Sequence, residues 1–436
     1  MRARSSTRKR AQVSTPQILD ELEWRGLIAH STDIDALRAD LSGGAVTLYC
    51  GFDPTAASLH MGNLLQLVTL RRFQEAGHRP IGLVGGATGL IGDPKEAGER
   101  ALNPAETVQE WSQVLRAQVG RFWTFDGVNA ALTVNNYDWT HDLSTIDFLR
   151  DIGKHFPVNR MLDREAVRAR LESGISYTEF SYVLLQSMDY LQLFRRFGCR
   201  LQTGGSDQWG NITAGVDLIR RVEGDRVHAL ATPLVTKADG TKFGKTEVGS
   251  VWLDPHMTSP YAFHQFWLNS DDREVIQFLR YFTFRDREEI AELATSVEAR
   301  PESRAAQRAL ADDVTTLVHG PTETARAVAA GAALFGAGDL RELDDETLDS
   351  ALRAAPHATL KSGDELPSVI DLLVESGLAP SKGAARRTVT EGGAYLNNVR
   401  INDAEAVPGE ADLLHGRWLV LRRGRRTVAG VEIVRQ

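Results

Sequence analysis

The feature that most constrains the fold is a strand–helix–strand unit near the N-terminus. Residues 45–53 (AVTLYCGFD) are apolar and β-prone, which predicts a buried strand. Residues 62–76 carry apolar side chains at helical spacing, and Gly77 ends that helix. Residues 80–87 (PIGLVGGA) predict a second strand. Two strands joined in this way by one helix run parallel, so the chain is expected to build a parallel sheet covered by helices.

The patterns that follow extend this unit and then change. Further strands are predicted at 131–135, 200–203 and 228–235, with helices at 145–153, 163–172, 178–196 and 208–222. From 259 to 335 the pattern is helical throughout. Residues 367–391 predict two short helices, and short strands follow them. The predicted fold class is α/β: a parallel-sheet domain, then an all-helical domain and a small α+β module.

Charge and cysteine content exclude several classes of protein. The net charge is −8, unlike a protein that coats nucleic acid non-specifically. The charge is local. Residues 1–15 are basic and predicted to be a disordered arm, and 413–436 carry six arginines against one acid. Residues 339–349 are acidic, which predicts either a solvated linker or an exposed helix. No apolar run is long enough to span a membrane. Two cysteines in no metal-binding spacing argue against structural zinc and favour a reducing cytoplasm.

The tetrapeptide HMGN, residues 60–63, lies where the first strand gives way to the first helix. A helix N-terminus there favours a phosphate, and Gly62 lets a nucleotide approach the backbone closely. His60 and Asn63 can donate hydrogen bonds to anionic oxygens. A plain helix cap with an incidental histidine explains these four residues as well.

The segment KFGKT, residues 242–246, places two lysines three residues apart around a glycine. Such a loop could neutralise charge that develops on a leaving pyrophosphate. It also resembles a P-loop, but the spacing between its glycines is one residue short and a β-like GSVWLD follows. A solvated lysine loop remains the alternative.

A polar stripe marks the helix predicted at 178–196. Tyr182, Gln186 and Asp189 lie at i, i+4 and i+7, on one face, among large apolar residues. A solvent-facing stripe would favour Lys and Glu, so this composition favours a polar pocket for a small ligand.

Two glycine-rich segments follow predicted strands. LQTGGSDQWGN, residues 201–211, is a strand-to-helix crossover of the kind that a nucleotide sugar site needs. GGATGLIGDPK, residues 85–95, does not fit the dinucleotide-binding spacing, so a dinucleotide site is poorly supported.

Together these motifs resemble the class I aminoacyl-tRNA synthetases, and the arrangement is similar to the bacterial-type tyrosyl-tRNA synthetases. TLYCGFDPTAASLHMGN resembles the first signature of that family, and KFGKT resembles its second. GGATGLIGDP, SYTEFSYVLLQSMDYLQL and LQTGGSDQWGNITAG are similar to its tyrosine-site and ribose-site segments. The likeness runs from about residue 16 to the C-terminus, with the motifs in the family's order.

The resemblance implies a role for each matching residue. The residues expected at the tyrosine are Tyr49 and Asp189 at the phenol, Tyr182, Gln186 and Asp93 at the ammonium, and Gln202 in the pocket wall. The residues expected at ATP are Cys50, Gly51, Asp53, His60, Gly62, Asp207, Gln208 and Lys245. The residues expected to act in catalysis are Thr55, His60, Asn63, Lys242 and Lys245.

The resemblance also implies partners and a division of the chain. A Rossmann-like catalytic domain is expected at 16–250, a helical anticodon-region domain at 251–335, an acidic linker at 336–365 and an RNA-binding module at 366–436. Lys382, Arg386 and Arg387 would bind RNA, helped by the arginines of the following strands, which are Arg417, Arg422, Arg423, Arg425 and Arg426. The expected substrates are tyrosine, ATP with Mg²⁺, and tRNA(Tyr). A cytoplasmic homodimer with neither a resident metal nor a membrane anchor is expected.

Two positions depart from the family pattern. The first signature usually ends in His, and here Asn63 keeps only a donor. The loop after Asp93 lacks the usual Ser-Gly-Lys setting, so Lys95 and Arg100 both stay candidates for the pyrophosphate. The alternatives are a tryptophanyl-tRNA synthetase, a non-catalytic RNA-binding protein and a P-loop NTPase. The polar pair Tyr49 and Asp189 disfavours the first, both lysines and His60 disfavour the second, and the loop spacing disfavours the third.

Overall fold

The computed structural model describes residues 18–94, 102–236, 243–246, 249–362, 366–424 and 427–435. The chain divides into two compact units, which are described separately below. The first unit comprises residues up to 253 together with 276–290, and the second comprises 254–275 and 291 onward.

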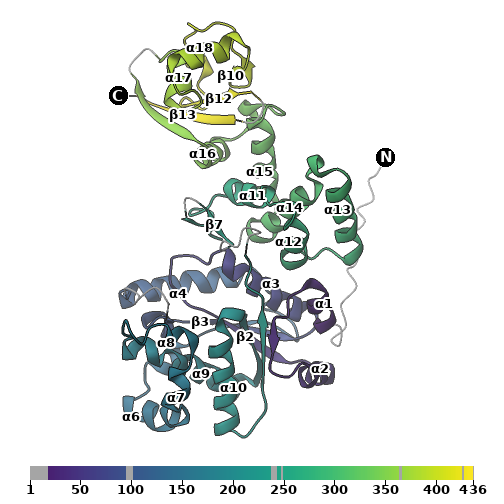
Figure 1. Cartoon of the computed structure of the whole chain (residues 1–436), viewed down its shortest axis with the longest axis vertical. Helices are drawn as coiled ribbons and strands as arrows, with labels where there is room; N and C mark the ends of the chain where they lie inside the picture. The colour runs from purple at the N-terminus through teal and green to yellow at the C-terminus, as the bar shows by residue number, and fades with distance from the viewer. Residues whose placement is uncertain are drawn as a thin grey trace. The chain divides into compact units, whose positions relative to one another are not determined.

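A six-stranded sheet forms the centre of the first unit (Figure 1). Its strands are β1 (His30–Ser31), β2 (Thr47–Phe52), β3 (Arg79–Val84), β4 (Leu132–Asn135), β5 (Cys199–Gly205) and β6 (His228–Thr232). The spatial order is β1-β6-β5-β2-β3-β4, and every pairing except that of β1 with β6 is parallel. The prediction of a Rossmann-like parallel sheet is confirmed. Because β2 lies between β3 and β5, the order reverses there, as at a ligand site in folds of this kind.

Helices cover both faces of this sheet. The helices of the unit are α1 (Ile18–Arg25), α2 (Ile34–Gly43), α3 (Met61–Glu75), α4 (Ala105–Val119), α5 (Tyr137–Thr140), α6 (Thr145–Asp147), α7 (Val158–Leu162), α8 (Glu165–Arg168), α9 (Tyr177–Phe197) and α10 (Trp209–Val222). Helices α3 and α4 lie on one face, and α9 and α10 lie on the other (Figure 1). Most of α3 is buried, which explains its apolar sequence.

Three predicted elements are shorter than their patterns suggested. The helix predicted at 145–153 is only α6, followed by a π-helical turn at Phe148–Ile152. The helix predicted at 163–172 reduces to α8, and β6 ends at Thr232 rather than at 235. A short hairpin, β7 (Lys245–Thr246) with β8 (Gly249–Ser250), completes the unit together with most of α12 (Val275–Phe282).

Two buried arginines attach the end of α12 to the rest of this unit. Arg25 donates to the carbonyl oxygens of Arg280, Thr283 and Arg285, and Arg72 donates to those of Arg280, Tyr281 and Thr283. Burial lowers the pKa of the Arg72 guanidinium, and nearby Arg25 lowers it further. These bonds satisfy carbonyl groups that a helix end leaves without intrahelical partners.

The second unit combines helices with a five-stranded sheet. Its helices are α11 (Pro260–Leu268), most of α13 (Arg287–Ala299), α14 (Ala305–His319), α15 (Pro321–Leu334), α16 (Asp345–Ala354), α17 (Val369–Glu375) and α18 (Lys382–Thr390). Its strands are β9 (His357–Ser362), β10 (Ala394–Leu396), β11 (Val399–Arg400), β12 (Trp418–Arg423) and β13 (Thr427–Arg435), in the order β11-β10-β12-β13-β9.

The segment expected as an acidic linker is instead folded. Within 336–365 the chain forms α16 and β9, and β9 pairs in parallel with β13. Leu348 and Leu352 of α16 are buried in one cluster with Trp418 and Val420. The acidic side chains lie on the other face of an amphipathic helix, so composition alone concealed it. The finer division into domains stays a prediction.

Candidate active site

The predicted tyrosine residues gather where β2 meets α9. Tyr49 in β2 is buried, and its ring lies 5.2 Å from that of Tyr190 in α9, centroid to centroid. Burial raises the pKa of Tyr49 well above its usual value, and the nearby Asp189 carboxylate raises it further. Helical spacing predicts Tyr182, Gln186 and Asp189 on one face of α9, and Tyr182 and Asp189 are both buried in that helix.

Asp189 is held by two donors that the motifs did not predict. Asn136 Nδ2 donates to Asp189 Oδ2 over 2.9 Å, and Trp139 Nε1 donates to Asp189 Oδ1 over 2.9 Å. Burial raises the pKa of Asp189 to about 7, although both hydrogen bonds lower it. Asp53 adds a smaller upward effect. A carboxyl of this kind can accept a hydrogen bond from a phenol in an otherwise apolar pocket.

Three buried polar atoms among the predicted tyrosine-site residues have no hydrogen-bond partner among the described residues. They are the Tyr49 hydroxyl, Gln186 Oε1 and Gln202 Oε1. Buried polar atoms in proteins are almost always paired, and each exception needs an explanation. A polar ligand between β2, β5 and α9 would explain all three.

Tyr182 and Asp53 form the opposite end of the same network. The Tyr182 hydroxyl donates to Asp53 Oδ2 over 2.7 Å, and Thr88 donates to Asp53 Oδ1 over 2.7 Å. Burial raises the pKa of Tyr182, and the Asp53 and Asp93 carboxylates raise it further. Gly85 is required here, because a Cβ at that position would lie 1.9 Å from Asp53 Oδ1.

Asp93 belongs to a neighbouring amide cluster. Gln208 Nε2 donates to Asp93 Oδ2 over 3.0 Å, and Asn211 Nδ2 donates to Asp93 Oδ1 over 3.1 Å. Arg164 donates in turn to Asn211 Oδ1. The sequence predicted Asp93 and Gln208 but not Asn211 or Arg164, since α10 and the turn after α7 meet only in the folded chain.

The start of α3 is a helix cap as well as a candidate phosphate site. His60 Nδ1 accepts from the Gly62 N–H over 3.0 Å, and Asn63 Oδ1 accepts from the His60 N–H over 3.0 Å. The capping alternative is therefore confirmed. Because Nδ1 accepts, a neutral His60 ring carries its proton on Nε2 and can donate there. Gly62 makes room for the His60 ring, whose Cε1 would lie 2.8 Å from a Cβ at that position.

The remaining predicted nucleotide residues lie around the end of β2 and the start of α10. Cys50 is buried, which raises its pKa to about 12, whereas Gly51 and Thr55 are exposed. Asp207 is exposed in the turn after β5. No three-residue cluster of His, Cys, Asp or Glu suited to a metal ion occurs in the part of the chain that the structure describes.

The lysine loop is described only in part. Lys242 lies outside the described residues, as do Lys95 and Arg100, and the backbone of Lys245 forms β7. Gly244, at φ 77°, packs so closely on Met61 that a Cβ would lie 2.8 Å from Met61 Cβ. The Gly244 carbonyl oxygen accepts from Val251, whose own oxygen accepts from Met61 N–H. This ladder fixes the segment beside the start of α3.

The predicted RNA-binding residues lie on α18. Lys382 contacts Asp371 over 2.6 Å and Arg386 contacts Glu405 over 2.8 Å, and these cations, like Arg387, are exposed. Two of the arginines predicted on the following strands are less available to a ligand, and Arg425 and Arg426 lie outside the described residues. Arg422 is buried and donates to the Phe335 carbonyl oxygen, and Arg417 contacts three acids, so neither adds to an open basic surface.

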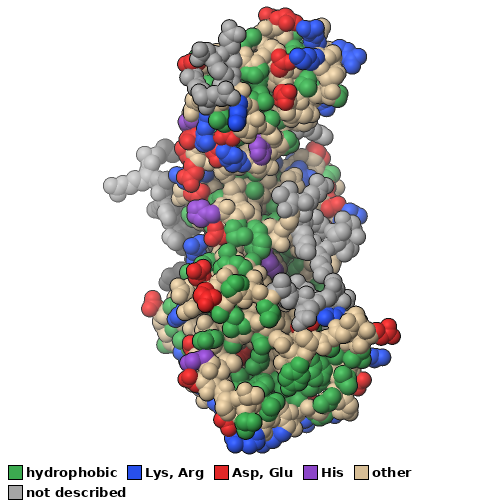
Figure 2. All heavy atoms as spheres, turned by 90° about the vertical axis from the view of Figure 1, so that its left-hand side faces the viewer, with side chains coloured by type: hydrophobic (Ala, Val, Ile, Leu, Met, Phe, Trp, Pro, Cys, Tyr) green, Lys and Arg blue, Asp and Glu red, His purple; other side chains and the backbone are tan. Residues whose placement is uncertain are grey.

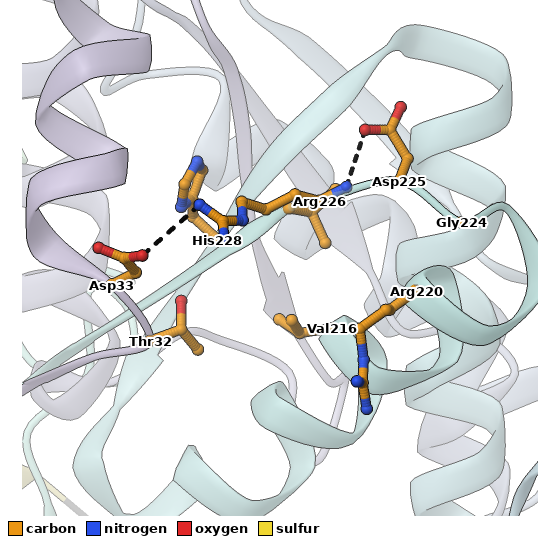
Figure 3. Close-up of a pocket in the computed structure, with 9 residues that line it drawn as sticks. Thr32, Asp33, Val216, Arg220, Gly224, Asp225, Arg226 and His228 are labelled. Carbon is orange, nitrogen blue, oxygen red and sulfur yellow. Dashed lines mark hydrogen bonds and ion pairs between the residues drawn. The ribbon is translucent and has the colours of Figure 1, made fainter.

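A separate surface groove lies at the β1–β6 side of the sheet (Figure 3). It has a volume of about 380 Å³ and contains the Arg226–Asp33 ion pair at 3.6 Å. Its lining residues are Thr32, Asp33, Val216, Arg220, Gly224, Asp225, Arg226, Val227 and His228. These include no predicted catalytic or tyrosine-site residue, so the groove is distinct from the candidate active site.

Comparison with known proteins identifies the family. A model described as tRNA synthetases class I (W and Y) matches residues 41–336, and a tyrosine–tRNA ligase SYY-like C-terminal domain matches 348–429. The chain belongs to the class I tRNA synthetases. A tyrosine–tRNA ligase of Streptomyces griseus subsp. griseus is 64% identical over 95% of this chain and 98% of its own. A tyrosine–tRNA ligase of Mycobacterium bovis is 59% identical over 95% of this chain and 98% of its own.

Solved structures agree with this membership. A C-terminally truncated mitochondrial tyrosyl-tRNA synthetase of Aspergillus nidulans aligns with a TM-score of 0.65 and 29% identity, covering 71% of this chain and 92% of that one. A tyrosyl-tRNA synthetase of Archaeoglobus fulgidus, complexed with L-tyrosine, aligns at 0.53 with 17% identity, over 70% and 99%. The second likeness concerns the fold alone.

Proposed function

We propose that this chain is a tyrosine–tRNA ligase. It activates tyrosine with ATP to tyrosyl-adenylate and pyrophosphate, and then transfers tyrosine to the 3′ end of tRNA(Tyr). The observation that carries the proposal is the pocket at Tyr49 and Asp189, in a chain similar to tyrosine–tRNA ligases over 95% of its length. A phenol hydroxyl can donate to Asp189 and accept from Tyr49, which an indole cannot do.

The residues divide into two groups along the substrates. Tyr49, Asp189 and Gln202 take the tyrosine side chain, and Tyr182, Gln186 and Asp93 take its ammonium. The remaining roles, at ATP, fall to Cys50, Gly51, Asp53, Thr55, His60, Gly62, Asn63, Asp207, Gln208, Lys242 and Lys245. Mg²⁺ enters as part of the nucleotide substrate.

Chemistry of this kind depends on placement. The tyrosine carboxylate attacks the α-phosphorus, the bond to the pyrophosphate oxygen breaks, and no covalent enzyme intermediate forms. The protein aligns the two reactants and stabilises charge on the pyrophosphate. His60 Nε2 and the two lysines supply donors at that end.

Tyrosine-dependent exchange of labelled pyrophosphate into ATP tests the proposal. Exchange with tyrosine, and not with tryptophan or phenylalanine, is expected from the full-length chain. Exchange driven by tryptophan instead would contradict it, and the absence of any exchange would favour a non-catalytic role.

Lys245→Ala tests the assignment of the lysine loop. We expect adenylate formation about 10²–10³-fold slower, with tyrosine binding nearly unchanged, because the loop acts on the polyphosphate. Single-turnover kinetics and a tyrosine titration separate the two effects. Weakened tyrosine binding with unchanged chemistry would contradict this role.

A homodimer is supported by exposed apolar side chains on the first unit. Ile146 is 70% exposed and Val158 is 61% exposed, and Tyr137, Leu149 and Leu162 are exposed nearby in the sequence. Figure 2, seen from the side of α6, α7 and α8, shows hydrophobic side chains gathered on the lower part of the molecule. Patches of this kind mark protein contacts. Light scattering on the unaltered chain and on Ile146→Lys tests the assembly.

Two further assignments are part of the proposal. The exposed bases of α18 contact tRNA, since surface ion pairs are weak enough to be exchanged for phosphates. The cytoplasm is the proposed location, which fits two free, buried cysteines. Among the described helices, none is long and apolar enough to cross a membrane.

A further inference from the structure

Thr88 lies at the middle of the buried network, between the two ends of the tyrosine pocket. It is 3% exposed and follows β3 in the glycine-rich segment 85–95. Its Oγ1 lies 2.7 Å from Asp53 Oδ1 and 2.9 Å from Asn136 Nδ2. One hydroxyl therefore joins the residues around Tyr182 to the residues around Asp189.

The proton positions along this chain are fixed by chemistry. An amide nitrogen only donates, so Asn136 gives one N–H to Thr88 and the other to Asp189. Its oxygen accepts from the Ala87 N–H over 2.7 Å, which settles the orientation of the amide. The single hydroxyl proton of Thr88 must then go to Asp53.

This polarity determines what Tyr182 presents to a ligand. Tyr182 donates its only hydroxyl proton to Asp53 Oδ2, so its oxygen can act only as an acceptor toward other groups. An acceptor oxygen is what an ammonium group needs. At the opposite end, the same amide of Asn136 holds Asp189 Oδ2, and an acceptor there is what a phenol hydroxyl needs.

We propose that Thr88 is a positioning residue for tyrosine recognition, because its hydroxyl ties the Asp53–Tyr182 pair and the Asn136–Asp189 pair into one hydrogen-bonded chain. The assignment rests on the proposed function. It implies that the ammonium end and the phenol end of the pocket are set together rather than independently.

Thr88→Val keeps the shape of the side chain and removes the hydroxyl. The KM for tyrosine in pyrophosphate exchange is expected to rise roughly 10- to 100-fold, since hydrogen bonds to charged groups are lost or displaced. The KM for ATP is expected to change less than the KM for tyrosine, because Asp53 is the one residue assigned to ATP with which the Thr88 hydroxyl is shown to bond. Discrimination against phenylalanine should fall. Thr88→Ser, which keeps the hydroxyl, should restore most of both properties.

Thr69→Val is the matched control. Thr69 in α3 is also fully buried, but its hydroxyl donates only to the Leu65 carbonyl oxygen of the same helix. A double-mutant cycle with Tyr182→Phe adds a second measurement. The double variant should raise the tyrosine KM by less than the product of the two single effects, because both side chains act through Asp53.

The outcomes separate this assignment from the proposed function. If the unaltered protein exchanges pyrophosphate, but Thr88→Val and Thr69→Val have tyrosine KM values within about twofold of each other, the role of Thr88 is overturned and the proposed function is not. Multiplicative effects of Thr88→Val and Tyr182→Phe would also overturn the role of Thr88. Unaltered protein without tyrosine-dependent exchange would overturn the proposed function first. If Thr88→Val does not fold, Thr88→Ala against Thr88→Ser makes the same comparison.

Discussion

Two ion pairs in this chain have the same chemistry in opposite environments. Arg170, which precedes α9, is 5% exposed, and Glu179 in α9 is 2% exposed. Arg170 Nη1 lies 3.2 Å from Glu179 Oε2. Arg386 and Glu405, in the second unit, are 58% and 72% exposed and lie 2.8 Å apart. The exposed pair is the shorter, yet water screens it and replaces it easily. Burial, rather than distance, decides which of these pairs the fold depends on.

The comparison extends to the two units. The candidate active site contains buried carboxylates held by buried donors, as around Asp189 and Asp53, beside buried polar atoms that have no partner among the described residues. The bases of α18 are exposed, and two of them have partners that a phosphate could replace. A specific small-molecule pocket needs the first arrangement, and a surface that binds and releases a polyanion needs the second.

The largest expected effect comes from breaking the buried pair. Arg170→Met leaves Glu179 without this partner and also removes the bonds from Arg170 to the Gly174 carbonyl oxygen. The free energy of unfolding of the first unit should fall by about 3–5 kcal/mol. Urea denaturation measures it, with Arg150→Ala, at an exposed arginine, as the control. A decrease in the free energy of unfolding of less than about 1 kcal/mol would mean that the buried pair stabilises the fold no more than an exposed pair does.

A slightly smaller effect is expected from Asp189 and pH. Burial raises its native pKa to about 7 from the ordinary aspartate pKa of 3.8, so the native state binds a proton that the unfolded state has lost. Stability from this group is present at low pH and is lost as pH rises through 7. Between pH 5 and pH 8 the loss is about 3 kcal/mol.

Asp189→Asn isolates that contribution. Other titrating groups are common to both proteins, so the fall in unfolding free energy from pH 5 to pH 8 should be about 3 kcal/mol larger for the unaltered chain. Equal pH dependence in the two proteins would contradict a native pKa of about 7 for Asp189.

The sequence predicted one wall of the pocket and missed the other for a physical reason. Helical spacing alone brings Tyr182, Gln186 and Asp189 together, because one helix defines their relative positions. Asn136 and Trp139 follow β4 and act on Asp189 only because β4 pairs beside β3 in the sheet. Contacts across a sheet leave no periodic pattern in the chain.

The linker interpretation of 336–365 was wrong for a related reason, whereas the alternative of an exposed helix at 339–349 agrees in part with α16. The acids of 339–349 dominate the composition of this stretch. Leu348 and Leu352 of α16 become buried only by packing with Trp418, which lies some 70 residues later in the chain. Arg422 is similar, since its burial against Phe335 and its place over the Tyr395 ring are not visible in a run of arginines. Helices and strands with a clear apolar pattern were predictable locally, but α4 and β9 were missed, α16 was only one of two alternatives, and the burial of charged residues was missed as well.

A more modest effect is expected on the exposed side. The triple variant Lys382→Ala, Arg386→Ala and Arg387→Ala should raise the KM for tRNA about tenfold and flatten its dependence on salt. Tyrosine-dependent pyrophosphate exchange should be unchanged, because none of these residues belongs to the first unit. Aminoacylation at several salt concentrations measures the effect. An unchanged KM for tRNA would contradict the RNA-binding role of α18.

The smallest effect tests whether the exposed pair is exchangeable. Glu405→Ala removes the partner of Arg386, and the free energy of unfolding should fall by less than about 1 kcal/mol. The same change makes Arg386 more available to a phosphate, so affinity for tRNA should rise slightly, to about twice its value at low salt. Stability and tRNA binding then move in opposite directions, which an ordinary structural pair would not produce. A loss of stability above about 2 kcal/mol together with weaker tRNA binding would instead place this pair in the same class as Arg170 and Glu179.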